Sequence, residues 1–342
     1  NLDNGNIYDS KSIKNKISKD YKKYNKQIID LDKKFKITKE KPIYTRDELR
    51  RRQFLAGMNI EDLELILHPM IEDAKEAVGS MGDDTPTAVL SDRYRPLSHF
   101  FRQNFSQVTN PPIDSLRENE VMSLKTRFGN TGNILDFENL TVDNIYVLES
   151  PILSNSQFHK FSDFFKKNMK ILDCTFNIKD ILKERLDELR SEAETAVREG
   201  SKHLILSDKA ISENRAGIPM ALAIGAINSR LVNLGIRSFA SINVQTSEAL
   251  DTHSFAVLLG VGATTINSYI AFDSIYQRYE KGLFGKISFD ECVQRYVTSV
   301  DNGLLKIMSK MGISVLSSYR GGCNFEAVGL SRSVVAEYFP SM

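Results

Sequence analysis

The sequence has few cysteines and no long apolar run, and both absences narrow the classes of protein it can belong to. Cys174, Cys292 and Cys323 lie far apart and form no Cys-x-x-Cys pair, so a zinc site is not expected. An odd, sparse set also argues for reduced thiols rather than a disulfide framework. No apolar run could span a membrane, and residues 1–10 lack the apolar core of a secretory signal. We therefore expect a protein of the cytoplasm or an organelle interior, with no membrane partner.

The sequence also has almost no net charge. The 342 residues are 41% hydrophobic and 26% charged, a globular composition sufficient for two or three structural units, and the net charge is +1. Residues 1–41, however, carry twelve lysines against six acidic residues, a net +6 that leaves −5 for the remainder. Basic runs can bind nucleic acid, but this one contains Asp and Asn and has no arginine. We expect a flexible basic linker over residues 1–41 and no nucleic-acid partner. The chain also begins with Asn1 rather than Met, which suggests an excised fragment.

The most distinctive stretch covers residues 79–118 and is rich in proline. It contains four of the nine prolines: Pro86, Pro96, Pro111 and Pro112. Each proline fixes its own φ and biases the preceding residue towards extended conformations. The sequence predicts a shaped loop around Pro86, a short aromatic helix over residues 94–107, and a rigid exit at the Pro111–Pro112 pair.

Another helix is predicted to begin after Thr45, because Thr45 and Glu48 have the spacing of a capping box. Together with the proline-rich stretch, it makes residues 42–143 a helical and proline-rich interdomain segment. Residues 144–342 then form the third predicted unit.

In this last unit apolar, strand-like runs alternate with helical patterns. Strands are predicted at residues 145–149, 170–174, 203–207, 238–245, 265–269 and 314–318. Helices are predicted near residues 155–168, 179–199, 214–235, 249–260, 274–284 and 288–311. Runs rich in Ile, Leu and Val suit a parallel sheet covered by helices, but six strands are too few for a closed eightfold barrel. The predicted fold class is therefore α/β, with parallel βα units forming an incomplete, barrel-like sheet.

Polar residues follow several of these strands, where parallel sheets commonly place their chemistry. A ring of Asp173, Asp208, Lys209 and Glu248 could support acid–base work. Asp173 and Asp208 could instead cap the helices that follow them, or their loops. Further along, the pair Gly321–Gly322 precedes a predicted helix and could bind phosphate, or it could simply form a tightly packed turn.

Four stretches of the sequence carry a family resemblance. Residues 79–93 read GSMGDDTPTAVLSDR, and residues 101–118 read FRQNFSQVTNPPIDSLRE. Residues 204–237 read LILSDKAISENRAGIPMALAIGAINSRLVNLGIR, and residues 304–330 read LLKIMSKMGISVLSSYRGGCNFEAVGL. These stretches resemble the central domain of the large chain of glutamate synthase.

The resemblance implies a connecting role in an oxidoreductase that acts on CH–NH2 donors. The parent enzyme converts glutamine and 2-oxoglutarate into two glutamates, and so serves ammonia assimilation. By resemblance, FMN and an iron–sulfur cluster belong to the parent, and this fragment holds no complete site, cofactor or metal. Its expected partners are the amidotransferase and flavin-binding domains of the same chain, with a small subunit or ferredoxin as electron source. The candidate interdomain and ammonia-passage residues are Asp83, Asp84, Thr85, Asn110, Pro111, Pro112 and Asp114.

Two other classes of function remain open at this point. One is a stand-alone barrel-like enzyme that acts on a phosphorylated small metabolite. The other is a binding module with a basic tail.

Overall fold

The computed structural model describes most of the chain. The described residues are 5–25, 28–42, 44–77, 95–105, 116–129, 144–322, 324–340 and 342. They fall into two compact units, one formed by Asn1–Lys34 and Arg127–Leu148 and the other by Phe35–Thr126 and Glu149–Met342. This division differs from the one predicted from the sequence, which stays a prediction.

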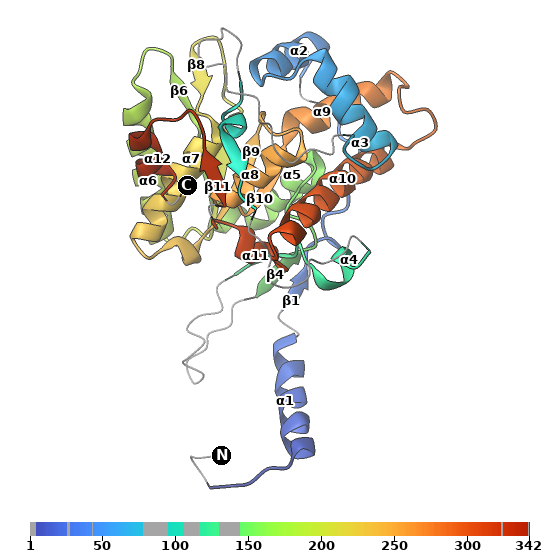
Figure 1. Ribbon diagram of the computed structural model, residues 1–342, viewed down its shortest axis with the longest axis vertical. Coiled ribbons are helices and arrows are strands. Elements are labelled where there is room, and N and C mark those ends of the chain that lie inside the picture. The colour runs from blue at the N-terminus through green and yellow to red at the C-terminus, as the bar shows by residue number, and fades with distance from the viewer. Residues whose placement is uncertain are drawn as a thin grey trace. The chain divides into compact units, whose positions relative to one another are not determined.

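The smaller unit is built around a short sheet. Its helix α1 spans Ser10–Asn25, and its parallel strand pair is β1 (Ile28–Asp30) and β4 (Ile145–Leu148). Strand β3 (Thr126–Phe128) completes the sheet in the order β1-β4-β3. A regular helix thus lies inside the segment that the sequence analysis treated as a linker. This helix is labelled α1 in Figure 1, and its residues 10–19 are exposed.

The larger unit is organised around a four-stranded parallel sheet in the order β10-β9-β7-β5. The strands are β5 (Met169–Asp173), β7 (His203–Ser207), β9 (Ser241–Thr246) and β10 (Thr265–Ser268). The helices between consecutive strands are α6 (Leu182–Arg198), α7 (Met220–Asn233) and α8 (Thr252–Val261). Because each strand pairs with the next one along the chain, right-handed crossovers place these three helices on one face. In the described residues the sheet is an open one, as the sequence predicted.

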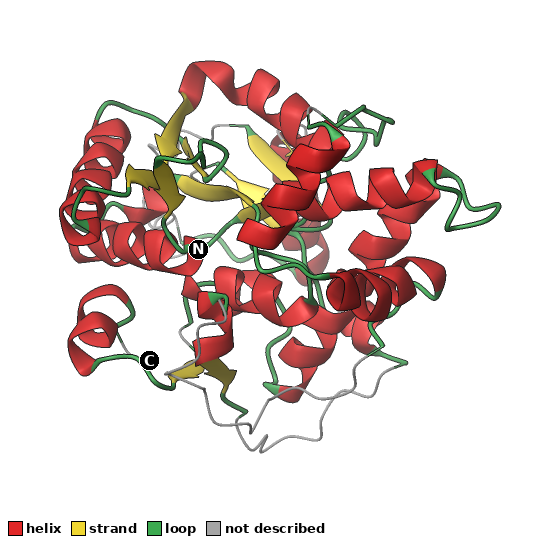
Figure 2. Cartoon of the chain, turned by 90° about the horizontal axis from the view of Figure 1, so that it is seen from above, coloured by secondary structure: helices red, strands yellow, loops and turns green. Residues whose placement is uncertain are grey.

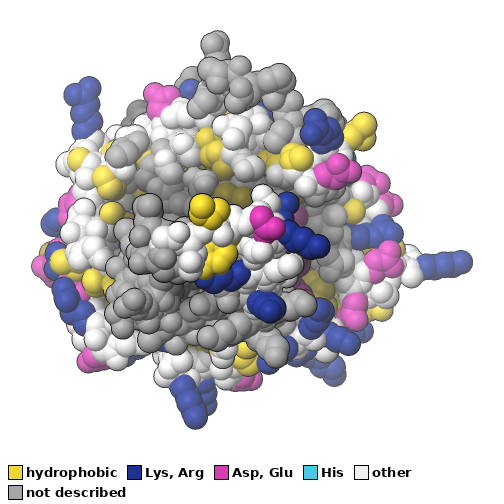
Figure 3. All heavy atoms as spheres, turned by 90° about the horizontal axis from the view of Figure 1, so that it is seen from below, with side chains coloured by type: hydrophobic (Ala, Val, Ile, Leu, Met, Phe, Trp, Pro, Cys, Tyr) yellow, Lys and Arg dark blue, Asp and Glu magenta, His cyan; other side chains and the backbone are white. Residues whose placement is uncertain are grey.

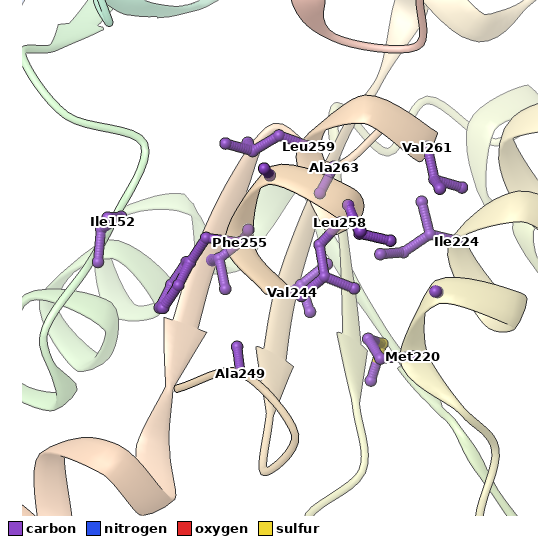
Figure 4. Packing of buried hydrophobic residues seen from close by; sticks show 14 of the residues in the cluster. Ile152, Met220, Ile224, Val244, Ala249, Phe255, Leu258, Leu259, Val261 and Ala263 are labelled. Atoms are coloured by element: carbon purple, nitrogen blue, oxygen red, sulfur yellow. The ribbon is translucent and has the colours of Figure 1, made fainter. Parts of the chain in front are cut away.

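The face beneath α6, α7 and α8 forms the hydrophobic core. Alternate strand residues point into it, and all of them are almost completely buried: Leu172, Leu204, Leu206, Ile242, Val244 and Ile266. Figure 4 shows Phe255 and Leu258 of α8 packed beside Val244, with Ile224 of α7 close to Val261. The helices touch in the sequence α6–α7–α8. At Gly225 of α7 an added Cβ would lie 2.5 Å from the Tyr338 carbonyl oxygen, so only glycine permits the close approach of helix α12 (Arg332–Tyr338).

Further helices surround this sheet (Figure 2). They are α2 (Arg46–Leu55), α3 (His68–Glu72), α4 (Glu118–Val121), α5 (Asn155–Phe165), α9 (Tyr269–Glu280), α10 (Phe289–Lys310), α11 (Leu316–Tyr319) and α12 (Arg332–Tyr338). A π-helical segment, η1, covers Asp62–Leu67, and 3-10 turns occur at η2 (Leu97–Phe100), η3 (Lys166–Asn168) and η4 (Arg237–Phe239). Thr45 caps α2 as predicted, because its hydroxyl accepts a hydrogen bond from the Glu48 amide.

Two small antiparallel strand pairs complete the larger unit. One joins β6 (Thr175–Asn177) to β8 (Arg215–Gly217), and the other joins β2 (Phe101–Gln103) to β11 (Phe325–Ala327). In the second pair, Gln103 donates to the Asn324 carbonyl at 2.7 Å and accepts from the Tyr319 hydroxyl at 2.7 Å. This pairing ties two segments that lie far apart in the sequence, because Gln103 and Asn324 are separated by 221 positions.

Three local predictions were wrong. Residues 95–105 were expected to be helical, but they contain a 3-10 turn followed by strand β2. The strand predicted at 314–318 is only an isolated bridge from Val315 to Ser123, after which the chain enters α11 and buries Leu316 and Tyr319. The helix predicted after Gly322 is strand β11, because its backbone completes the pair with β2.

The surface of the described residues carries charges of both signs. On the face shown in Figure 3, Lys and Arg side chains are interspersed with Asp and Glu side chains. No helix among the described residues is long and apolar enough to pass through a bilayer.

Candidate functional site

The second face of the four-stranded sheet carries several buried polar side chains beside apolar ones such as Ile205. Asn243 and Asn267 are fully buried, and Thr265 beside them is also buried and donates to Asn243 at 2.8 Å. His203 on the same face packs against Phe165 of α5 with ring centroids 4.0 Å apart, and its Nδ1 lies 2.9 Å from the Ser241 hydroxyl. Burial lowers the pKa of His203 to about 4, so this imidazole is neutral near neutral pH.

A chain of hydrogen bonds follows the carboxyl ends of the strands on this face. The Ser207 hydroxyl donates to Gln245 at 3.1 Å, and Gln245 donates to Asn267 at 3.3 Å. Asn267 donates to Asn155 at 2.9 Å, and Asn155 donates to the Asp273 carboxyl group at 2.8 Å. Each amide thus both donates and accepts, which satisfies buried polar groups that would otherwise destabilise the fold.

Asp208 lies beside this chain and is almost completely buried. One of its oxygens, Oδ2, accepts hydrogen bonds from the Thr246 hydroxyl at 2.9 Å, the Ser247 amide at 2.8 Å and the Ser247 hydroxyl at 3.0 Å. Burial raises the pKa of Asp208, and these hydrogen bonds partly oppose the rise. The other oxygen, Oδ1, and the Tyr269 hydroxyl are both buried without a partner of hydrogen-bond geometry. Tyr269 also acts to lower the pKa of the Asp208 carboxyl group.

Lys209 and Asp273 complete the group that we call the carboxyl-edge cluster: Asn155, Asp208, Lys209, Tyr269 and Asp273. The Lys209 ammonium lies 5.5 Å from the centre of the Tyr269 ring. Burial lowers the pKa of Lys209, and the nearby Asp273 carboxyl group partly opposes this. Burial raises the pKa of Asp273 to about 7, against the opposing effects of Lys209, Asn155 and Arg52.

A small hollow of about 20 Å³ adjoins the cluster at Asp273 and Asn155. It is also lined by Thr38, Glu40 and Phe289. A volume of this size holds about one water molecule. Asp273 can therefore bind and release a proton near neutral pH in contact with a water-sized space, and this is the main chemical capacity of the cluster.

The structure brings together only half of the predicted acid–base ring. Asp208 and Lys209 belong to the cluster. Asp173 instead pairs with Arg215 at 2.6 Å and accepts from the Thr175 hydroxyl at 2.7 Å. Glu248 accepts from the Met220 amide at 2.9 Å, at the first turn of α7. Asp173 therefore bonds to Thr175, just beyond its strand, and to Arg215, and Glu248 bonds to the start of α7.

Sequence reasoning missed Asn155, Tyr269 and Asp273. A signal was present for Asp273, because it is the one carboxylate in the otherwise apolar run YIAFDSI of residues 269–275. A charge on the buried stripe of a helix is costly unless it is bonded or neutralised. The candidate interdomain residues all lie outside the described residues: Asp83, Asp84, Thr85, Asn110, Pro111, Pro112 and Asp114.

Comparison with known proteins identifies the family. The family model described as "Glutamate synthase central domain" matches residues 51–331. The NADPH-type glutamate synthase large chain of Azospirillum brasilense is 52% identical over 349 residues, which cover 100% of this chain and 23% of that one. The corresponding large chain of Bacillus subtilis (strain 168) is 38% identical over 341 residues, 99% of this chain and 22% of that one.

The chain thus spans less than a quarter of the length of these curated relatives. Among solved structures, the flavin-binding domain of baker's yeast flavocytochrome b2 aligns with 86% of this chain and 96% of its own, at 10% identity. Its TM-score of 0.43 is too low to carry an argument. The family match covers most of the sequence, and the chain therefore belongs to the glutamate synthase central domain family.

Proposed function

We propose that this chain is the connecting domain of a glutamate synthase. In this proposal the parent enzyme converts glutamine and 2-oxoglutarate into two glutamates, and the chain links its amidotransferase and flavin-binding domains. The observation that carries the proposal is the share of each chain that the alignments cover. The relatives cover essentially all of this chain, while this chain covers only 23% and 22% of their length.

The bonding of the carboxyl-edge cluster supports a connecting role. Asp208 has three donors on one oxygen, and Asn155 links Asp273 to the amide chain. These side chains hold the helices and strands of the sheet edge together. A domain placed between two others must keep its shape while its neighbours move, and a bonded polar network is rigid.

The loop residues Asp83, Asp84, Thr85, Asn110 and Asp114 are proposed as polar contacts to the neighbouring domains. Pro111 and Pro112 would fix the backbone there and help to wall a passage for ammonia. The proposal for this pair rests on the fixed φ of proline.

The proposed FMN and iron–sulfur cluster would belong to other parts of the parent chain. Cysteine thiolates are the usual cluster ligands, but Cys174 and Cys292 do not fit this role. Both are completely buried in the hydrophobic core, and burial raises the pKa of both thiols, that of Cys292 to about 11. Electrons would come from a small subunit or from ferredoxin.

The purified chain tests the proposal by itself. We expect it to be colourless and to hydrolyse no glutamine above background, because the nucleophile and the flavin site would lie elsewhere in the parent. The control is the longer parent chain, prepared in the same way and expected to do both. Stoichiometric flavin absorbance or glutamine hydrolysis by the 342-residue chain would overturn the connecting role.

A further inference from the structure

Two partly buried arginines lie at the amino end of β10, opposite the carboxyl-edge cluster. Arg237 donates to the Gly262 carbonyl at 2.8 Å, and Arg320 donates to the Thr264 carbonyl at 3.4 Å. Gly262 ends helix α8, with a φ of 138°. The two guanidinium groups therefore bind carbonyls of the same short segment of backbone, and the positive charge of Arg320 contributes to a lowered pKa of Arg237.

Arg237 is well supplied with acceptors. Besides Gly262, it donates to the Asn228 side-chain oxygen at 2.6 Å and to the Ala240 carbonyl at 2.7 Å. All three acceptors are uncharged. The carbonyl end of helix α8 adds a favourable partial negative charge, which stabilises a cation at this position without neutralising it.

Arg320, in contrast, has no acceptor at a short hydrogen-bond distance among the described residues. Its two hydrogen bonds, to the Thr126 hydroxyl at 3.5 Å and to the Thr264 carbonyl at 3.4 Å, are long and share the nitrogen Nη2. Its Nε is buried and has no hydrogen-bond partner. An unsatisfied charged donor of this kind is costly.

Other arginines with little exposure show what is missing. Each bonds a carboxylate at 2.6–3.0 Å, in the pairs Arg52–Glu48, Arg185–Glu192, Arg190–Glu337 and Arg278–Glu64. No carboxylate among the described residues pairs with Arg237 or Arg320. Burial lowers the pKa of both to about 10, and the positive charge of Arg320 adds to the effect on Arg237. The pair is thus a local excess of buried positive charge.

The glycine turn next to Arg320 lies at the surface. Gly321 and Gly322 are both exposed. Their amides do not form a phosphate cradle, because Gly321 donates to the Leu259 carbonyl at 3.3 Å and Gly322 donates to the Tyr319 carbonyl at 3.1 Å. An anion at this turn would therefore be held by guanidinium groups rather than by backbone amides.

We propose that Arg320, with Arg237 beside it, forms a binding site for a carboxylate. A carboxylate matches the guanidinium fork, supplies the absent negative charge and gives the Arg320 Nε an acceptor. In the chain by itself, the ligand would be a small soluble carboxylate. In a longer parent chain it would be an Asp or Glu side chain from another domain, and this second source rests on the proposed function.

The first test uses acetate as the probe on the 342-residue chain. Thermal unfolding is followed in sodium acetate and in sodium chloride at equal ionic strength, near pH 7. We expect a saturable rise in Tm with acetate alone, because a ligand that binds only the folded state stabilises it. Arg320→Gln should weaken the apparent acetate affinity at least tenfold. Arg198→Gln is the matched control, because Arg198 is more exposed and already pairs with Glu194 at 2.8 Å, and it should respond as wild type.

An equal acetate response in wild type and Arg320→Gln would overturn the proposal. If that variant does not fold, the wild-type chain is titrated with acetate and the Nε–Hε NMR signal of Arg320 is followed. This signal is assigned by its loss in Arg320→Lys. A saturable shift of this signal on acetate addition is expected. An unchanged signal at high acetate would contradict the site.

The second test separates the two sources and uses the longer parent chain. If another domain supplies the carboxylate, acetate shifts the Arg320 signal in the 342-residue chain but not in the parent. If the ligand is a free anion, the signal shifts in both. Either result supports the carboxylate site. Loss of the proposed glutamate synthase role would change only this second comparison, so the two failures are distinguishable.

Discussion

Asp273 is a buried residue whose ionisation affects the stability of the folded protein. Its side chain is buried, accepts from Asn155 at 2.8 Å and lies in the same cluster as Lys209. Burial nevertheless dominates, so the pKa rises from 3.8 to about 7. The folded protein therefore holds a proton on Asp273 in a range of pH in which the unfolded chain has lost it.

The raised pKa of Asp273 determines whether stability rises or falls with pH. Between about pH 4 and 7 the folded state binds more protons than the unfolded state, so the contribution of Asp273 to stability falls as the pH rises through this range. Asp273→Asn keeps an acceptor for Asn155 and removes the ionisation. We expect the free energy of unfolding of the variant to fall less between pH 4.5 and 7.5, by roughly 1.4 kcal/mol for each unit of raised pKa.

Urea unfolding at a series of pH values measures this difference. Asp163→Asn is a suitable control, because Asp163 is an exposed residue of α5. Parallel stability curves for wild type and Asp273→Asn would show that Asp273 titrates normally, and would contradict the assigned environment.

For single residues, the sequence predicts features that depend only on neighbouring positions. The cap at Thr45 depends on residues only three positions apart, so it could be predicted. The carboxyl-edge cluster could not. Asn155 and Asp273 come together only because α5 and α9 pack at the same sheet edge, and nothing in either helix alone specifies that contact.

At the scale of elements, helix α1 differs from the other long helices. Its residues 10–19 are exposed, including the apolar Ile13 and Ile17, which are 44% and 60% exposed. An isolated helix of about this length is only marginally stable in water. By contrast, Leu31 and Phe35 just beyond it are buried, and Phe35 packs edge-on against Phe161 and Phe164.

We therefore expect trypsin to cut first at the lysines of α1. The first stable fragment should keep Leu31 and Phe35, and mass spectrometry of a short digest identifies its start. The sequence alone suggested a stable core from about residue 42, and the packing of Phe35 moves that expectation towards the N-terminus. Strong amide-exchange protection across residues 11–25 would contradict a loosely held helix.

Strands and helices of the βα repeat could be predicted because their patterns are long and periodic. The strands at 145–148, 169–173, 203–207, 241–246 and 265–268 were all expected within a few residues. Short strands such as β2 and β11 could not be predicted. Three residues show no alternation, and each is a strand only because the other is present.

At the scale of the whole parent enzyme, the Pro111–Pro112 pair provides a test of the proposed passage. Replacing both with alanine adds unfolded-state entropy of about 0.4–1 kcal/mol per site where the native geometry already suits proline. That is small against a typical domain stability of roughly 5–15 kcal/mol, so the domain should still fold. In the parent enzyme we expect glutamine hydrolysis to exceed glutamate formation, because a less rigid wall would let ammonia escape.

Both products are measured in one reaction mixture. Pro340→Ala is the control, since Pro340 is exposed near the end of the chain. Strict stoichiometry in the Pro111/Pro112 double variant would argue that these prolines form a plain structural turn.

The pairing of β2 with β11 also has a consequence for the order in which the chain acquires its structure. Strands β5, β7, β9 and β10 each find their partner one helix away, so this sheet can assemble progressively while a ribosome is still extending the chain. Strand β2 is made before all of them, yet its partner β11 is made after them. In the finished protein Phe101 is almost completely buried, and its ring lies 4.9 Å from that of Phe339. Phe101 therefore lacks this packing partner until translation of this region is nearly complete.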